Sequence, residues 1–293
     1  FGYLGKINTQ ELKDFPDYTS TDLIGKTGLE RQYERILRGH PGIVDIKRNA
    51  AGKIVDKQII KEPEPGKSLQ LWLDAELQAK AKEALEVTLK KVGSKKGAVI
   101  ALDPNTGGVL AMVSIPSFDP NIFSRGITEE EFQKLQQDPN HPLFPRAIAG
   151  QYPSGSTIKP IIASSALQEG IIKPNDQLFA PLELCTKNIY SGQKECFADW
   201  TFHGWTDVRR AIAESINPFF YLIGGGYQKN EFSDPRLPDS FVGLGVSKIK
   251  KYLSMFGWGQ KTGIDLPGEA EGRIPDPSWK ENYFKDPQDK LWI

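Results

Sequence analysis

Two apolar runs separated by a short turn constrain the fold of this chain more than any other feature of its sequence. Residues 98–102 and 109–115 are apolar, and the segment between them reads Asp-Pro-Asn-Thr-Gly-Gly. Because these residues favour tight turns, the pattern predicts an antiparallel hairpin. Immediately before it, apolar residues recur at helical spacing from Leu77 to Val92, with Asp74 as the expected N-cap. A helix, a hairpin and then a block of helices predict an α+β layer fold.

The remaining elements follow from weaker patterns. Residues 61–67 (Lys-Glu-Pro-Glu-Pro-Gly-Lys) break every regular pattern, and we expect a domain boundary there. This predicts a small mixed unit over residues 1–64 and a larger one over residues 65–293. We expect helices at 29–37, 128–137, 155–169, 206–224 and 241–256, and strands at 44–46, 53–55 and 69–73.

Charge and composition exclude several functions. The chain has 37 basic and 37 acidic residues, so it lacks the basic surplus of a nucleic-acid-binding protein. No stretch approaches the roughly 18 apolar residues that span a bilayer. Only three histidines are present, His40, His141 and His203, which nearly excludes a histidine-based metal site and leaves few candidates for a Ser-His-Asp triad. Chemistry based on serine, lysine or carboxylates remains open.

A serine and a lysine three residues apart are the main candidates for catalysis. Ser156 and Lys159 lie in the segment Tyr-Pro-Ser-Gly-Ser-Thr-Ile-Lys-Pro, residues 152–160. On a helix that begins near Gly155, both side chains share one face. A desolvated lysine there would accept the serine's proton, and the N–H groups of the helix N-terminus would stabilise an oxyanion. The same spacing at Ser191/Lys194 and Ser247/Lys250 is typical of a solvated surface pair.

A second polar motif would complete this site. The pattern Ser-x-Asn occurs once, at Ser215 and Asn217, and Pro218 follows it. Because a proline disfavours helix at the residue before it, we expect the helix from Asp207 to break here and to present both side chains in a loop. A hydroxyl and an amide facing Ser156 and Lys159 would provide a proton relay and a clamp for a peptide carbonyl. Taken alone, the motif is more typical of a helix C-cap with an asparagine at a turn.

Together these motifs resemble the signature of serine acyltransferases that react with penicillin, in which Ser-x-x-Lys, Ser-x-Asn and Lys-Thr-Gly follow in that order. Within that superfamily the chain resembles a class B penicillin-binding protein of the elongation-specific penicillin-binding protein 2 type. The resemblance covers nearly the whole chain, through residues 2–5, 24–30, 102–107, 152–160 and 262–269. It implies an antiparallel sheet with a helical subdomain, the penicillin-binding/β-lactamase-like transpeptidase fold, over residues 65–293. It also implies a partial non-catalytic pedestal (dimerisation-type) domain over residues 1–64.

The resemblance implies a role for each site residue. Ser156 would be the acylated nucleophile, Lys159 its general base, and Ser215 the relay to the leaving amine. Asn217 would contact the side-chain amide of the substrate or of a β-lactam. The implied enzyme is a peptidoglycan D,D-transpeptidase that cross-links stem peptides, is inhibited by β-lactams and requires no cofactor. The alternatives are a β-lactamase or D,D-carboxypeptidase on the same scaffold, or a non-catalytic scaffold module of a cell-wall elongation complex.

Lys-Thr-Gly, the third signature, occurs at residues 26–28 and again at 261–263. The first copy precedes Ser156 and matches the family's pedestal segment, and the second runs into a turn-prone stretch that matches a different family landmark. We expect neither copy to be the catalytic motif. The resemblance places that motif on a core strand after Ile293, and we expect a chain without it to be inactive. It also implies an N-terminal transmembrane helix before Phe1, at the extracytoplasmic face of a bacterial inner membrane.

The two cysteines allow three states. Cys185 and Cys196 flank Ser191-Gly192, and a hairpin turn at that point would bring them close enough for a disulfide. Some members of the resembled type hold a metal near this loop, which suggests zinc bound by Cys185, Cys196 and His203 as a weaker alternative. Two unpaired thiols are the third option. The resemblance further implies stem peptides, a membrane glycosyltransferase and elongation-complex scaffold proteins as partners, without nucleic acid.

Overall fold

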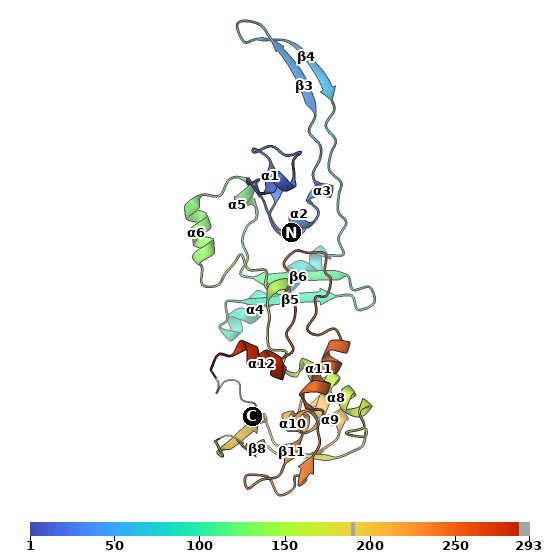
Figure 1. Cartoon of the computed structure of the whole chain (residues 1–293). Helices are drawn as coiled ribbons and strands as arrows, with labels where there is room; N and C mark the ends of the chain where they lie inside the picture. The colour runs from blue at the N-terminus through green and yellow to red at the C-terminus, as the bar shows by residue number, and fades with distance from the viewer. Residues whose placement is uncertain (189–190, 287–293) are drawn as a thin grey trace. The chain divides into compact units, whose positions relative to one another are not determined.

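The structure of the chain is a computed structural model that describes residues 1–188 and 191–286. The chain divides into two compact units (Figure 1). Unit 1 comprises Phe1–Gly150 together with Gly263–Ala270, and unit 2 comprises Gln151–Thr262 together with the chain from Glu271 onward. Among the described residues, none of the helices combines the length and the apolar composition that a bilayer span requires.

Unit 1 consists of short antiparallel strand pairs and mostly short helices. Its strands pair as β1 (Leu4–Lys6) with β2 (Leu23–Gly25), β3 (Ile43–Arg48) with β4 (Ile54–Lys61), and β5 (Gly97–Leu102) with β6 (Val109–Ile115). Its helices are α1 (Glu11–Asp14), α2 (Gly28–Gln32), α3 (Glu34–Leu37), α4 (Ala75–Val92), α5 (Asn121–Ser124), α6 (Glu129–Gln137) and α7 (Arg146–Ala149). The strands and helices confirm the α+β class expected from the sequence.

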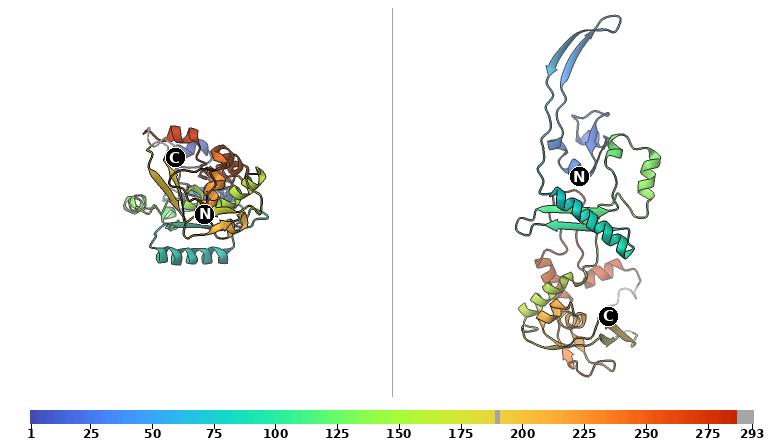
Figure 2. Two further views of the ribbon diagram at one scale, coloured as in Figure 1. Left: turned by 90° about the horizontal axis from the view of Figure 1, so that it is seen from below. Right: turned by 180° about the vertical axis from the view of Figure 1, so that it is seen from behind.

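The strongest sequence prediction, a helix followed by a hairpin, is confirmed. The Asp74 carboxylate accepts the Leu77 N–H at 2.9 Å and caps α4, as the N-cap pattern predicts. Leu85 and Leu89 of α4 are buried against Val113 of β6, which gives α4 its apolar face. Figure 2 shows α4 lying across the β5–β6 hairpin. This packing is the core of the sheet portion of unit 1.

Two expectations in the first part of unit 1 are wrong. The helix expected at residues 29–37 is interrupted at Tyr33, whose φ of −110° and ψ of 19° separate α2 from α3. Residues 69–73, all within the described range, form no strand. Their alternation reflects burial on one side, because Leu69, Leu71 and Leu73 are half-buried whereas Gln70 and Trp72 are exposed. One-sided packing gives the same period of two as a strand, without a partner strand.

The β3–β4 hairpin is confirmed and is longer than the sequence pattern suggested. The expected strands at 44–46 and 53–55 extend to Ile43–Arg48 and Ile54–Lys61. All residues of both strands are exposed, so their side chains contribute no core. The turn around Asn49 is closed by its side chain, which accepts the Lys53 N–H at 3.0 Å. Such Asx geometry is a local property of the sequence.

Unit 2 places short strand pairs beside a group of helices. Its helices are the 3₁₀ turn η1 (Gly155–Ile158), α8 (Lys159–Gln168), α9 (Val208–Ala213), α10 (Asn217–Gly225), α11 (Gly245–Met255) and α12 (Pro277–Tyr283). Its strand pairs are β7 (Leu178–Ala180) with β10 (Gly204–Thr206), β8 (Glu183–Lys187) with β9 (Lys194–Ala198), and β11 (Tyr227–Gln228) with β12 (Ser240–Phe241). All three pairs are antiparallel.

Apolar residues of α8, α9 and α10 build the main core of unit 2. Ala166, Ala211, Phe219 and Ile223 are completely buried in one cluster, and Leu244 just before α11 joins it. Because α10 is apolar on most of its surface, it lies at the centre of this cluster. Ile216, directly before α10, is also completely buried. The core therefore fixes α8 and α10, the two helices whose first residues are the lysine and asparagine predicted as site residues.

The helix expected at 206–224 is two helices. The predicted break is present, because α9 ends at Ala213 and α10 begins at Asn217. Ser215 lies in the loop, as expected, but Asn217 is the first residue of α10 and not a loop residue. Pro218 occupies the first turn of α10, where a missing N–H costs nothing. Pro218 therefore lies at the start of a helix, whereas it was predicted to end one.

Candidate active site

Ser156 is exposed and Lys159 is buried at the start of α8. Ser156 lies in η1, and Lys159, with 8% of its surface exposed, begins α8. Gly155, directly before the serine, has a φ of 56°, a left-handed conformation that a side chain disfavours. The glycine therefore allows the sharp turn that leads into η1. An accessible hydroxyl beside a desolvated amine is the arrangement that the Ser-x-x-Lys spacing predicts.

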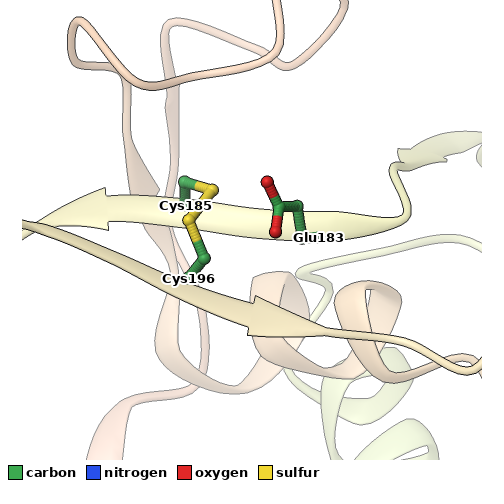
Figure 3. A group of neighbouring side chains, drawn as sticks. All are labelled: Glu183, Cys185 and Cys196. Atoms are coloured by element: carbon green, nitrogen blue, oxygen red, sulfur yellow. A yellow bond between two sulfur atoms is a disulfide. The ribbon is translucent and has the colours of Figure 1, made fainter.

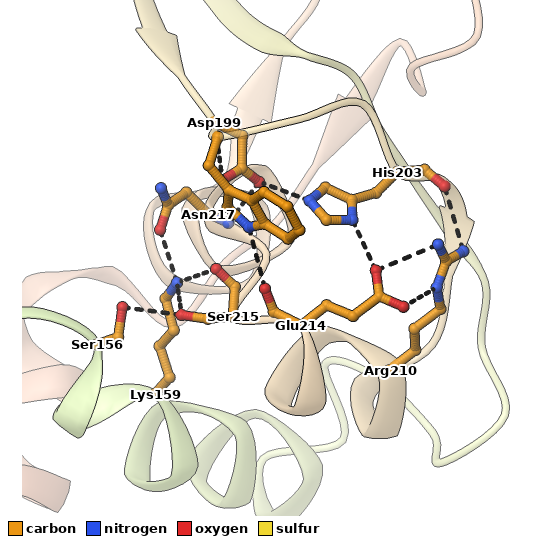
Figure 4. A network of polar contacts seen from close by, with 9 residues as sticks. Ser156, Lys159, Asp199, His203, Arg210, Glu214, Ser215 and Asn217 are labelled. Carbon is orange, nitrogen blue, oxygen red and sulfur yellow. Dashed lines mark hydrogen bonds and ion pairs between the residues drawn. The ribbon is translucent and has the colours of Figure 1, made fainter.

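The ammonium of Lys159 holds the Ser-x-Asn motif. Its Nζ donates to the Ser215 backbone carbonyl at 2.6 Å, to Ser215 Oγ at 3.0 Å and to Asn217 Oδ1 at 2.6 Å (Figure 4). These three acceptors match the three N–H bonds of an ammonium. The structure thus brings together the two motifs, which are separated by more than fifty residues in the sequence.

Ser215 connects the lysine to the serine. Its Oγ lies 3.0 Å from Ser156 Oγ and 3.0 Å from Lys159 Nζ, so a continuous chain of polar atoms runs from Ser156 to Lys159. The φ of Ser215 is 54°, an uncommon backbone conformation for a residue with a side chain. All four residues named from the sequence therefore lie in one hydrogen-bonded cluster.

Burial dominates the electrostatics of Lys159. Desolvation lowers the pKa of its amine below the ordinary value of 10.5, whereas the negative charge of Asp199 acts to raise the pKa. The Phe220 ring centroid lies 5.3 Å from Nζ, and this ring covers part of the amine's surroundings. A lower pKa makes the neutral amine, which is the form that accepts a proton, available at lower pH.

Four residues to which the sequence motifs gave no catalytic role complete the surroundings of the cluster. The carboxylate of Asp199 is fully buried and accepts the Asn217 backbone N–H at 2.9 Å. His203 Nδ1 lies 2.8 Å from Glu214 Oε2, and Arg210 also binds the Glu214 carboxylate. These residues come together only through the fold, as Figure 4 shows. The one signal for these residues in the sequence was the Asp199-Trp200 pair and His203, which come shortly before the Ser-x-Asn motif.

The two Lys-Thr-Gly segments lie outside the strands of the structure. Lys26 belongs to unit 1, where it forms an ion pair with Glu11, and Thr27 is the residue before α2. Residues 261–263 lie outside any helix or strand. Neither segment therefore has the strand conformation expected of the catalytic third motif.

The cysteines form a disulfide. Cys185 and Cys196 are directly opposed on β8 and β9, and their sulfurs are bonded to each other (Figure 3). The predicted hairpin is confirmed, and residues 189 and 190 lie outside the described part of the chain. Because both sulfurs are used in the bond, they are not zinc ligands, and of the neighbouring group only the Glu183 carboxylate remains as a donor. The disulfide is thus favoured over the zinc alternative.

Comparison with known families identifies the class of protein that has this fold and in which Ser156, Lys159, Ser215 and Asn217 form one cluster. The chain belongs to the penicillin-binding proteins: residues 97–287 match the penicillin binding protein transpeptidase domain, and residues 1–71 match the penicillin-binding protein dimerisation domain.

Relatives indicate the branch of the family. The chain is 36% identical to the peptidoglycan D,D-transpeptidase MrdA of Acinetobacter baumannii, over 95% of this chain and 38% of the relative. It is 35% identical to MrdA of Escherichia coli K12, over 98% of this chain and 42% of the relative. The chain therefore spans about two fifths of the length of the curated relatives it matches. Together with both domain families, these identities identify an elongation-type class B penicillin-binding protein.

Solved structures agree with this assignment. Penicillin-binding protein 2 of Helicobacter pylori in complex with MreC matches with a TM-score of 0.75 and 31% identity, over 99% of this chain and 50% of the other. Penicillin-binding protein 2 of Pseudomonas aeruginosa in complex with WCK 5153 matches with a TM-score of 0.72 and 32% identity, over 99% of this chain and 54% of the other. The predicted transpeptidase fold class is thus confirmed.

Proposed function

We propose that this chain is part of a peptidoglycan D,D-transpeptidase that cross-links stem peptides through a serine acyl-enzyme at Ser156. The observation that carries the proposal is the continuous contact from Ser156 Oγ through Ser215 Oγ to Lys159 Nζ, with both distances 3.0 Å. The transpeptidase domain family and the MrdA relatives support the same activity.

The geometry serves acylation when Lys159 is neutral. A neutral amine has two N–H bonds and one lone pair, so it still donates to the Ser215 carbonyl and to Asn217 Oδ1 while accepting from Ser215 Oγ. The Ser215 hydroxyl then points to the lysine and accepts the Ser156 proton. In the proposed reaction, Ser156 Oγ bonds to the carbonyl carbon of the penultimate D-Ala, and its proton moves through Ser215 to Lys159.

The same atoms return the proton. As the tetrahedral intermediate collapses, the amide C–N bond breaks, and the terminal D-Ala leaves as an amine protonated through Ser215. An amine of a neighbouring stem peptide then attacks the ester carbonyl and loses its proton to the same relay. The ester bond to Ser156 breaks, the serine regains a proton, and the new peptide bond is the cross-link. A β-lactam would acylate Ser156 in the same way but would keep its leaving amine tethered.

The rest of the proposal concerns the whole protein. We assign residues 1–64 to part of a non-catalytic pedestal and residues 65–293 to the N-terminal part of the transpeptidase domain. The proposed partners are stem peptides, a membrane glycosyltransferase and elongation-complex scaffold proteins, and the proposed location is the extracytoplasmic face of the inner membrane. Complexes of similar chains support such partners, one with MreC and one described as a peptidoglycan synthase complex.

A fluorescent penicillin tests the proposal on the full-length protein. We expect stoichiometric, stable labelling of wild type, no labelling of Ser156→Ala, and normal labelling of Ser247→Ala. Ser247 is the matched control because it also precedes a lysine, Lys250, by three residues. Labelling of Ser156→Ala at the wild-type level would refute the nucleophile. Rapid β-lactam turnover would favour a β-lactamase or carboxypeptidase, and a folded wild type that never labels would favour a non-catalytic scaffold.

A further inference from the structure

A fully buried carboxylate lies behind the Ser-x-Asn motif. Asp199 follows β9, and its side chain has no exposed surface. One of its oxygens, Oδ2, accepts the Asn217 N–H at 2.9 Å, and the other, Oδ1, accepts the Trp200 N–H at 2.8 Å. An ionised carboxylate at such depth is costly unless donors or positive charges compensate it. Asp199 therefore contacts the backbone of Asn217, the first residue of α10, and the side chain of Asn217 binds Lys159.

A buried histidine lies between this carboxylate and a second one. The His203 side chain is 1% exposed, with Nδ1 2.8 Å from Glu214 Oε2 and Nε2 3.5 Å from Asp199 Oδ2. At that distance Nε2 has no hydrogen-bond partner among the described residues. A ring with one N–H donates to only one of its two neighbours, and donation to both requires both nitrogens to be protonated.

The second carboxylate belongs to the residue directly before Ser215. Glu214 Oε1 and Oε2 are bound by Arg210 at 2.9 and 3.3 Å, and the backbone carbonyl of Glu214 accepts the Trp200 indole N–H at 3.1 Å. Arg210 first, and His203 second, lower the pKa of the Glu214 carboxyl. The strained loop at Ser215 is therefore held on one side through Glu214 and on the other through Asp199 and the Asn217 N–H.

We propose that Asp199 and His203 form a positioning pair for the proposed acylation site. In this pair, Asp199 fixes the start of α10 and supplies a negative charge that acts on Lys159, and His203 lies between the two carboxylates and contacts Glu214. The inference rests on the proposed function, and it assigns no contact with substrate to either residue. Within the described part of the chain, Lys159 Nζ contacts the Ser215 and Asn217 acceptors and the Phe220 ring, and none of these carries a charge.

The acylation rate as a function of pH tests the pair. Asp199→Asn keeps an oxygen acceptor for the Asn217 N–H but removes the charge. Because a nearby anion stabilises the ammonium of Lys159, its removal shifts the rising limb of the acylation profile toward lower pH. His203→Gln is expected to lower the acylation rate about tenfold, as loss of a buried contact to a charged group would. Asp239→Asn, at a side chain that is 95% exposed, is the matched control and leaves the limb unchanged.

Hydrogen exchange of the peptide spanning residues 214–222 provides a second readout that needs no enzymatic activity. This peptide is expected to exchange slowly in wild type and faster in Asp199→Ala and His203→Gln, while thermal unfolding shows that the variants are folded. If the rising limb of the acylation profile is not shifted in folded Asp199→Asn, Asp199 does not act through its charge. If hydrogen exchange of the peptide is unchanged in both Asp199→Ala and His203→Gln, the pair does not position the start of α10. If wild type is not acylated at Ser156, the proposed function fails, and the exchange result alone decides on the pair.

Discussion

Replacing Ser215 by glycine and by alanine separates the role of its hydroxyl from the strain in its backbone. The φ of 54° at Ser215 costs a residue with a Cβ roughly 1–2 kcal/mol. Glycine removes that cost but adds about 0.4–1 kcal/mol through the greater freedom of the unfolded chain. Alanine keeps the Cβ and its strain. We therefore expect Ser215→Gly to be more stable than Ser215→Ala by about 1 kcal/mol.

The same two variants should be equally impaired in acylation. Both lack the oxygen that lies 3.0 Å from Lys159 Nζ and 3.0 Å from Ser156 Oγ. Loss of a proton relay typically reduces the rate about 10²–10⁴-fold, and neither replacement offers a substitute. The assays are thermal unfolding, in which about 1 kcal/mol corresponds to roughly 2–4 °C, and the rate of labelling by a fluorescent penicillin.

Two results would refute this reasoning. Equal melting temperatures for the glycine and alanine variants would show that the left-handed conformation of Ser215 stores no strain in the folded protein. Wild-type labelling rates in either variant would show that the proton of Ser156 does not pass through the Ser215 hydroxyl. A difference in labelling between two equally folded variants would indicate that the backbone, in addition to the hydroxyl, positions Ser156.

The structure supports four further predictions. Lys159→Met should be acylated about 10²–10⁴-fold more slowly than wild type. The acylation rate of wild type should rise with pH below 10.5, because burial lowers the pKa of Lys159. A Met variant that keeps this rise would contradict the role of Lys159 as general base. Since the folded-state pKa is the lower one, the contribution of Lys159 to stability should increase with pH between the two values, which unfolding at several pH values would measure. Replacing both Cys185 and Cys196 by serine should destabilise the protein by about 3 kcal/mol, because the disulfide closes a loop with a sequence separation of 11; an unchanged denaturation midpoint would be inconsistent with the bond. Thr128→Ala should cost about 1 kcal/mol by removing the N-cap of α6, seen as faster hydrogen exchange over residues 129–137.

Local patterns predicted the elements of the fold that have local causes. The helix from Asp74 and the hairpin of β5 and β6 follow from a cap, a period and a turn, which depend on neighbouring residues only. The alternation at residues 69–73 was misleading because Leu69, Leu71 and Leu73 are half-buried on one side of a segment that is not a strand. Burial on one side has the period of a strand without its hydrogen bonds. Pro218 was read as a stop, although the same residue is well suited to the first turn of a helix.

Only those residues of the site that belong to sequence motifs could be predicted. Ser156, Lys159, Ser215 and Asn217 were named from spacing and family resemblance, and the fold brings them into one cluster. Their relay geometry was not predictable, because Lys159 reaches Ser156 through Ser215. Asp199 was missed entirely, and His203 was considered only as a zinc ligand. Burial beside α10 gives these two residues their importance, and burial is a property of tertiary packing that sequence spacing does not carry.

Peptide mapping by mass spectrometry tests the central claim most directly. The full-length protein is treated with benzylpenicillin, digested and mapped, alongside Ser156→Ala and the control Ser247→Ala. The account predicts one penicilloyl adduct on the peptide that contains Ser156, present in wild type and in Ser247→Ala and absent from Ser156→Ala. An adduct on any other residue, or an unchanged adduct in Ser156→Ala, would contradict it.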